Sequence, residues 1–217
     1  MPLKDIVNVE LLRTEQPDDI SRIWLSYHQE RSYLSAVVNA ATYDCISSRT
    51  ARWYDAHLKR ITHQSLSATH SHLSLSPVCR SPMFVALLPR ETGCLSLLLQ
   101  VVQKHHWLLT TISEYQSKGQ NASPRMMVSF YTEFKDDKQL VLMRGHVDQS
   151  LVSLAEAQAI VNLLQIHYLD DKLFSAWVEV FNHSPQSFDW EEFSKAALAP
   201  PPPPSTSPPS SSSPPTS

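Results

Sequence analysis

The sequence predicts an α+β fold, in which a mainly antiparallel β-sheet is flanked by N-terminal and C-terminal helices. From Ser81 to Asp148 the chain reads as successive short apolar runs joined by turn residues. Short connections favour antiparallel neighbours, because parallel strands need long crossovers. On either side of this region, apolar residues recur at helical spacing. The length allows a single domain with a real core, which we place at residues 1–199.

Helices are predicted ahead of the sheet. One of these helices follows Pro17, because proline suits a first helical turn and acidic residues are favourable near a helix N-terminus. Its apolar residues lie three, four and seven positions apart and should face the core. In chain order the predictions are a weak helix Lys4–Arg13, this helix with its stripe Ile20, Ile23, Trp24 and Tyr27, a short strand Tyr33–Val38 and a helix within Ala40–Trp53.

Five strands are predicted in the central region. The first has prolines at both ends, which suits a short strand better than a helix interior. In the third, Trp107 and Leu109 share one face at the two-residue period of a strand, and Leu108 lies on the other. The five ranges are Pro82–Pro89, Leu95–Val102, His106–Gln116, Met126–Phe134 and Gln139–Val147.

Helices should follow the sheet. Ser153 and Glu156 form a capping box, in which each side chain satisfies the backbone N–H of the other residue. The helix that they open should run to about Asp170 and pack on the sheet through the stripe Ala157, Val161, Leu164 and Tyr168. Beyond it we predict a helix or strand Leu173–Phe181 and a last helix Phe188–Leu198, started by Ser187.

Two segments lack the pattern of a packed structure. In residues 54–80, Ser, Thr and His dominate and hydrophobic periodicity fades, which predicts a disordered insertion. From Pro200 to Ser217 only Pro, Ser and Thr remain, and such a tail should be disordered or extended polyproline-II.

The composition excludes several classes of function. A formal charge of -3 offers no footprint for nucleic acid or an anionic membrane, and no run of about eighteen apolar residues predicts a membrane span. Three widely spaced cysteines indicate a reducing compartment and no disulfide framework. The first residues resemble neither a secretory signal nor an organelle presequence.

No catalytic, cofactor-binding or metal-binding residue is predicted. The three glycines are far apart, whereas a phosphate-binding loop needs clustered glycines. A Gly-x-Ser-x-Gly elbow is absent, so a hydrolase would need an unrecognised triad. His57, His63, His70, His72 and Cys79 match no zinc module, and we interpret any metal binding there as adventitious.

Charged residues near the end of the fifth predicted strand are interpreted as structural. Arg144 and Asp148 lie on one face of that strand, and Glu133 and Glu114 belong to strands that could be its neighbours. An ion pair on the sheet surface is the simplest prediction for them.

Several segments together resemble the family of mitochondrial F1 complex assembly factors that chaperone the β subunit of ATP synthase. Their order and spacing, over most of Leu3 to Phe193, carry the resemblance. The segments are Val7–Leu12, Ile23–Tyr27, Pro82–Arg90, Ser129–Phe134, Leu140–Gly145, Ala155–Gln158 and Trp177–Asn182.

The resemblance implies an α+β domain and a function without catalysis or cofactor. Such a protein holds the unassembled β subunit until the α subunit takes its place, and it would be a mitochondrial monomer. The sequence departs from the family pattern at residues 54–79, which look inserted, and in the Pro/Ser tail. It also lacks a visible import presequence ahead of Leu3.

Solvent-facing apolar residues of the sheet and its neighbouring helix are the predicted client contacts. Candidates come from strands that are apolar on both faces, and core packing is the alternative for each. They are Phe84, Leu97, Leu99, Trp107, Leu109, Phe130 and Tyr131. Two other functions stay open, namely an adaptor that uses the proline tail to recruit a partner and a small hydrolase.

Overall fold

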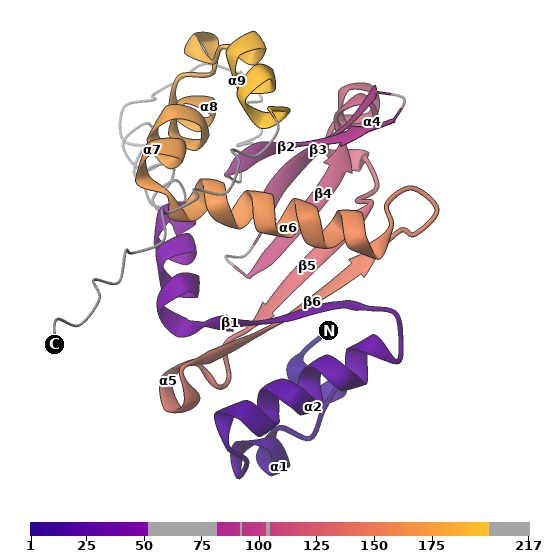
Figure 1. Ribbon diagram of the computed structural model, residues 1–217, viewed down its shortest axis with the longest axis vertical. Coiled ribbons are helices and arrows are strands. Elements are labelled where there is room, and N and C mark those ends of the chain that lie inside the picture. The colour runs from indigo at the N-terminus through magenta and orange to yellow at the C-terminus, as the bar shows by residue number, and fades with distance from the viewer. Residues whose placement is uncertain (52–81, 92, 103–104, 200–217) are drawn as a thin grey trace, which may run out of the picture.

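The computed structural model describes residues 1–51, 82–91, 93–102 and 105–199 (Figure 1). Its described part contains an antiparallel sheet of six strands in the order β1-β6-β5-β4-β3-β2. The strands are β1 Leu34–Asn39, β2 Met83–Arg90, β3 Gly93–Val102, β4 His106–Thr111, β5 Met126–Tyr131 and β6 Leu140–Val147. Neighbours β2 to β6 are joined in chain order, so the α+β prediction is confirmed.

Helices flank this sheet on the N-terminal and C-terminal sides, as predicted. Residues 40–51 are helical as well. The others are η1 Leu3–Asp5, α1 Val9–Arg13, α2 Pro17–Gln29, α4 Ile112–Lys118, η2 Gly119–Asn121, α5 Lys135–Lys138, α6 Leu154–Leu169, α7 Asp171–Leu173, η3 Phe174–Glu179, α8 Val180–His183, η4 Pro185–Ser187 and α9 Trp190–Ala197. The predicted insertion and proline tail lie outside the described residues.

The N-terminal prediction was right for α2 and wrong for the segment before it. The predicted helix Lys4–Arg13 is divided into η1 and α1, because the side chain of Asn8 accepts the backbone N–H of Leu11 and starts a new helix. In α2, Ile20 and Trp24 are fully buried, whereas Ile23 is exposed. The indole N–H of Trp24 donates to the carbonyl of Met143, 3.0 Å away, and fixes α2 on the sheet.

The predicted strand His106–Gln116 is wrong in its second half. Strand β4 ends at Thr111, whose hydroxyl accepts the backbone N–H of Glu114 and caps α4. The alternation of apolar and polar residues continues through this point, but a threonine three positions before a glutamate also favours a helix start. The capping interaction of Thr111 therefore ends the strand and starts α4. Similarly, α9 is capped by Asp189 rather than by Ser187.

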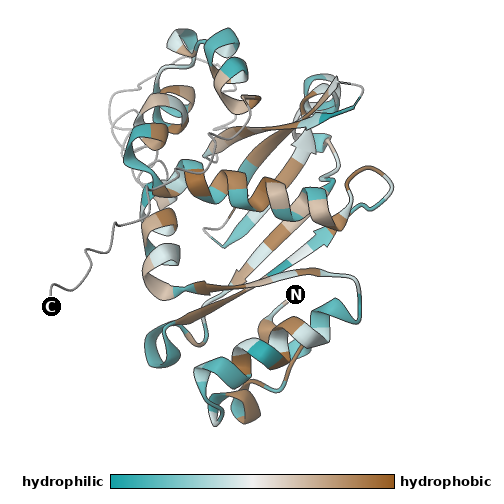
Figure 2. Ribbon diagram, viewed as in Figure 1, coloured by the Kyte–Doolittle hydropathy of each residue, from teal (hydrophilic) through white to brown (hydrophobic). Residues whose placement is uncertain are grey.

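Helix α6 forms the second layer and runs across one face of the strands (Figure 1). Its predicted capping box is confirmed, with Ser153 and Glu156 bonded in both directions. Figure 2 shows α6 and the strands behind it with long stretches of apolar residues. Toward one edge, the side chain of Asn182 in α8 bonds both the N–H and the carbonyl of Met83, at 2.9 and 2.6 Å. This pairing satisfies part of the outer edge of β2.

Two cores result from this arrangement. The larger lies between the sheet and α6 with the C-terminal helices, and we call that side the covered face. A smaller core lies on the opposite side, where η1, α1 and α2 pack against β5 and β6. Its buried members are Leu3, Leu12, Ile20, Trp24, Tyr131, Phe134 and Leu142. We call this side the groove face, because the second core covers only part of it.

Candidate functional site

The seven residues predicted as client contacts are all buried. Six of them belong to the covered face and are at most 5% exposed, namely Phe84, Leu97, Leu99, Trp107, Leu109 and Phe130. The ring of Phe84, for example, lies 5.6 Å from that of Phe193 and 6.1 Å from that of Phe181. Tyr131 is on the groove face, but it packs against Trp24 and is 7% exposed. Client contact by these side chains stays a prediction, and it would require the core to open.

The neighbouring positions of the same strands line an open groove. Successive residues of a strand point to opposite faces, so Leu108 faces away from Trp107 and Leu109. One row across the sheet pairs Val102 with His106, His106 with Ser129 and Ser129 with Arg144. The next row pairs Leu108 with Met127 and Met127 with His146. These two rows, together with Met1 and Tyr131, line a cavity of about 440 Å³.

The groove is bounded on two sides by buried residues. One boundary is the second core, where Tyr131 pairs with Leu142 across β5 and β6. The other is the paired Leu98 and Thr110, which are both buried. Between these boundaries Met127 is 41% exposed, and Leu108 is partly exposed beside it. The groove thus presents an apolar strip on an otherwise packed sheet.

The polar groups of the groove are mostly nitrogen donors. The Nδ1 atom of His106 lies 3.0 Å from the hydroxyl of Ser129. Burial, then the positive charges of the chain N-terminus and His105, lower the pKa of His106. Its ring is therefore neutral at pH 7. His146 at the other end of the groove is exposed.

Arg144 lies at the end of the first row. The central carbon of its guanidinium is 4.0 Å from the centroid of the Tyr33 ring, close enough for a cation–π contact. Its Nε atom is buried and has no hydrogen-bond partner among the described residues. Within the same residues, no carboxylate oxygen lies within 4.0 Å of its nitrogens.

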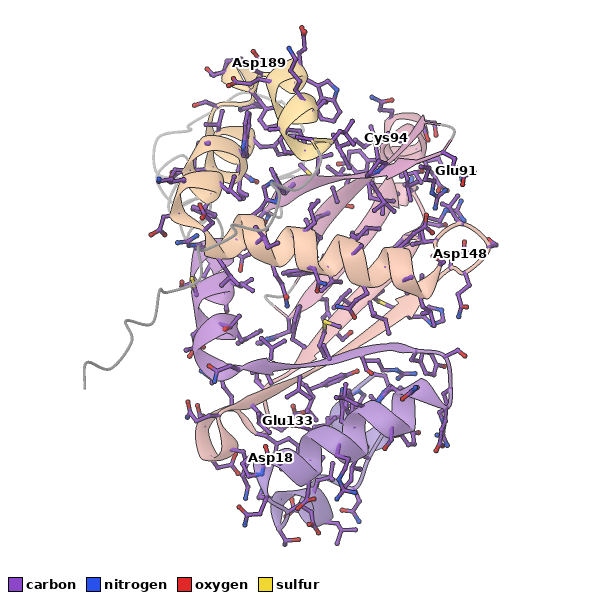
Figure 3. All side chains as sticks on the ribbon, in the orientation of Figure 1. Asp18, Glu91, Cys94, Glu133, Asp148 and Asp189 are labelled. Carbon is purple, nitrogen blue, oxygen red and sulfur yellow. The ribbon has the colours of Figure 1, made fainter. Side chains whose placement is uncertain are left out.

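The predicted ion pair on the sheet surface, between Arg144 and one of the acidic residues Asp148, Glu133 and Glu114, is therefore wrong for Arg144. Asp148 pairs instead with Arg125 at 3.0 Å, and Arg125 also reaches Glu114 at 2.9 Å. Hydrogen bonds from Ser150 and then from Arg125 hold the pKa of Asp148 below its ordinary value. Figure 3 places Asp148 beside the loop that leads into α6, and Glu133 at the far end of the sheet. Asp148 lies opposite Arg125 next to the last paired residues of β5 and β6, where its backbone N–H donates to the carbonyl of Arg125, whereas Arg144 is four residues away along the strand.

The groove holds a serine beside a histidine, His106 with Ser129, at 3.0 Å. A serine beside a histidine begins a nucleophilic triad, but the histidine also needs a carboxylate to orient it. For His106 and His146 of the groove, no carboxylate oxygen of the described residues lies within 4.0 Å. In the same part, no three metal-ligating side chains gather, and no helix is long and apolar enough to cross a membrane.

The described part of the chain is thus an α+β fold with one sheet face covered by helices and a partly apolar groove on the other. The chain is a member of the ATP11 protein family, whose model matches residues 1–73 and 75–194. This confirms the resemblance found in the sequence. The match runs through the segment predicted to be an insertion and ends before the proline tail.

Curated relatives carry the name "ATP synthase mitochondrial F1 complex assembly factor 1". The protein from Danio rerio is 26% identical over 86% of this chain, and that from Homo sapiens 27% over 87%. The Mus musculus protein is 26% identical over 87%. The chain spans about half the length of these relatives. Their name describes a non-enzymatic class of protein.

Most of the predicted client-contact residues lie on the covered face, whereas the groove lies on the opposite face of the same sheet. Trp107, Leu109 and Phe130 were among the predicted residues, but Leu108 and Met127 were not. Both sets are apolar at a two-residue period, so hydropathy alone does not tell which set a helix will cover. The signal that could have found the groove is the interruption of one face by polar residues, namely His106, Ser129, Arg144 and His146.

Proposed function

We propose that this chain is an assembly chaperone of the mitochondrial ATP synthase F1 sector. It binds the unassembled β subunit, prevents its aggregation and hands it to the α subunit. The observation that carries the proposal is the groove, an exposed apolar strip on a sheet of a chain that belongs to a family of F1 assembly factors. By the same reasoning the protein acts in mitochondria, as the names of the relatives indicate for those proteins.

Physical chemistry supports a capping function. A subunit that lacks its partner exposes the apolar surface of the missing interface, which makes it prone to aggregation. A domain that covers this surface removes the hazard without any chemical step. An interface of roughly 1,600 Å² binds at micromolar to picomolar strength. Because interfaces between permanent subunits are larger, the α subunit can displace the chaperone.

Light scattering from isolated F1 β subunit tests this function. The folded chain should suppress the increase in scattering near equal stoichiometry, and addition of α subunit should reverse the suppression by releasing the β subunit into assembly. Absence of suppression by a folded sample would reject the proposal.

A matched pair of variants tests the surface. Met127→Asp places a charge on the apolar strip of the groove, whereas Ile166→Asp places one on the outer side of α6, where Ile166 is 56% exposed. Burial of an unpaired charge in an interface is costly. We expect Met127→Asp to weaken binding at least tenfold and Ile166→Asp to leave it unchanged. Equal binding by both variants would place the contact surface elsewhere.

A further inference from the structure

Arg144 differs from every other arginine that the structure describes. Arginines elsewhere in the described residues have a carboxylate oxygen within 4.0 Å, and their partners lie on nearby loops or helices. The pairs are Arg13–Asp137, Arg22–Asp19, Arg31–Glu30, Arg49–Asp171, Arg90–Glu156 and Arg125–Glu114 with Asp148. Arg144 has no such partner, although it lies in a groove and carries a permanent charge.

The surroundings of Arg144 fix the guanidinium in place. It lies over the ring of Tyr33, and its Nε atom is buried. Burial raises the pKa of Tyr131, and the positive charge of Arg144 acts in the opposite direction, which indicates that the two side chains are close. A guanidinium held by its neighbours loses little further conformational entropy when it binds a ligand.

The electrostatics of the groove favour an anionic group. None of its lining residues is acidic, and His106 and His146 are two further nitrogen donors near Arg144. The chain as a whole has a formal charge of -3, so the positive charge that Arg144 places in this lining is a local feature. A carboxylate fits a guanidinium well, because two parallel hydrogen bonds can form between them.

The apolar strip lies one sheet row away from Arg144. Rows that face the same side are two residues apart along each strand, which is roughly 7 Å. Leu108 and Met127 occupy the row next to His106, Ser129 and Arg144. A ligand that places a carboxylate on Arg144 can therefore place a neighbouring apolar side chain on Leu108 and Met127.

We propose that Arg144 binds a carboxylate side chain of the F1 β subunit, with an adjacent apolar side chain of that subunit on Leu108 and Met127. This inference rests on the proposed function and names the chemistry of the client segment, an aspartate or glutamate beside an apolar residue. The carboxylate supplies orientation, because a salt bridge and its hydrogen bonds depend on geometry, whereas apolar contact does not.

The affinity of isolated β subunit for four forms of the chain tests this inference. Arg144→Gln removes the charge, and Arg144→Met removes the charge but keeps an aliphatic side chain over Tyr33. Arg22→Gln is the control, because it removes one positive charge from α2 at a side chain that is 75% exposed. We expect both Arg144 variants to weaken binding tenfold or more, and the control to bind within twofold of the wild-type chain.

A double-mutant cycle then identifies the partner carboxylate. Exposed aspartates and glutamates of the β subunit are replaced one at a time by asparagine and glutamine. At one position the replacement should weaken binding to the wild-type chain and leave binding to Arg144→Gln unchanged, since the pair is already broken. Thermal unfolding of each variant shows that the fold is retained.

Three negative results are distinguishable. If the wild-type chain binds β subunit and both Arg144 variants bind as tightly, the role of Arg144 is overturned and the proposed function stands. If the wild-type chain binds no β subunit, the proposed function and this inference both fall. If binding weakens but no β-subunit carboxylate is coupled to Arg144, the carboxylate assignment is overturned.

Discussion

The two faces of the sheet differ in coverage rather than in hydrophobicity. Leu109 and Leu108 are chemically identical neighbours on β4, yet Leu109 is fully buried under α6 and Leu108 lines the groove. The covered face is closed along its length by α6 and the C-terminal helices. The second core, built around α2, covers only the β5–β6 side of the other face. The groove thus lies where the helices leave part of this sheet face uncovered.

Because the two faces differ in coverage, their apolar residues should contribute to different properties of the protein. A buried leucine stabilises the fold, because it removes its apolar area from water on folding. A partly exposed apolar side chain contributes less to the fold, and a group of them marks a site for a partner. Mutations on the two faces should therefore divide into those that lower stability and those that weaken binding. Urea unfolding and β-subunit binding of variants on each face test this division.

Substitution of neighbouring leucines should give the largest contrast. Leu109→Ala deletes a fully buried side chain, so we expect a loss of about 2–5 kcal/mol in the free energy of unfolding. Leu108→Ala should cost about 1 kcal/mol or less, since water already reaches part of this side chain. Urea unfolding followed by tryptophan fluorescence measures both. Equal losses would mean that the groove is closed in solution.

Gly145→Ala should be the next most costly change. Gly145 pairs with Leu34 on the covered face, and an added Cβ would lie 2.8 Å from Cδ2 and 2.9 Å from Cβ of that leucine. Overpacking of this kind costs about 1–3 kcal/mol. Because the clash involves the Cβ atom of Leu34, rotation of the leucine side chain does not remove it. The free energy of unfolding in urea gives the cost.

A double substitution provides the control for Gly145. If the clash with Leu34 is the cause, Leu34→Gly, which also removes the Cβ atom, combined with Gly145→Ala should lose less stability than the sum of the two single variants. Simple additivity would show that the alanine is harmful for another reason, such as a change in the twist of β6.

The elements predicted correctly are those in which local sequence and burial agree. Strands β2, β3, β5 and β6 and helices α2 and α6 have strong apolar periodicity and clear terminal signals, and the structure forms them close to the predicted ranges. The errors occur where two local signals compete. At Thr111 a capping interaction ended a strand that alternation would have extended, and at Asn8 another divided a helix.

The sequence predicted the apolar strands of the candidate site but did not predict which face of the sheet stays uncovered. The sequence placed apolar residues on both faces of the strands, but the covered face is determined by where α6 docks, which is a long-range outcome. The charged residues show the same limit. Asp148 forms its ion pair with Arg125 rather than with Arg144, because the register of β5 and β6 places Arg125 opposite Asp148, and this register is set by long-range pairing.

Glu156→Gln should have a moderate, pH-dependent effect on the covered side. Hydrogen bonds from the backbone of Ser153, from Arg90 and from the Ser153 hydroxyl lower the pKa of Glu156 from 4.5 to about 2. The folded state therefore favours the ionised carboxylate. This stabilisation is complete above about pH 4.5 and is lost as the pH falls toward 2. Removal of the charged cap should cost about 1 kcal/mol at pH 7.

The pH profile of thermal unfolding checks this assignment. The wild-type chain should lose stability between pH 4.5 and pH 2 more steeply than Glu156→Gln, and the two curves should approach each other at the acid end. Parallel curves would show that the carboxylate of Glu156 is not held in the capping box and the Arg90 pair in solution.

Met127→Gln should have the smallest effect on stability of the set. The side chain is 41% exposed at the floor of the groove, and surface substitutions without a buried partner change the free energy of unfolding by about 0.5 kcal/mol or less. Glutamine has nearly the shape of methionine, so the groove should keep its form while its apolar strip becomes polar. We therefore expect unchanged urea unfolding together with weaker capture of β subunit. A large loss of stability would place Met127 in the core and remove the distinction between the two faces.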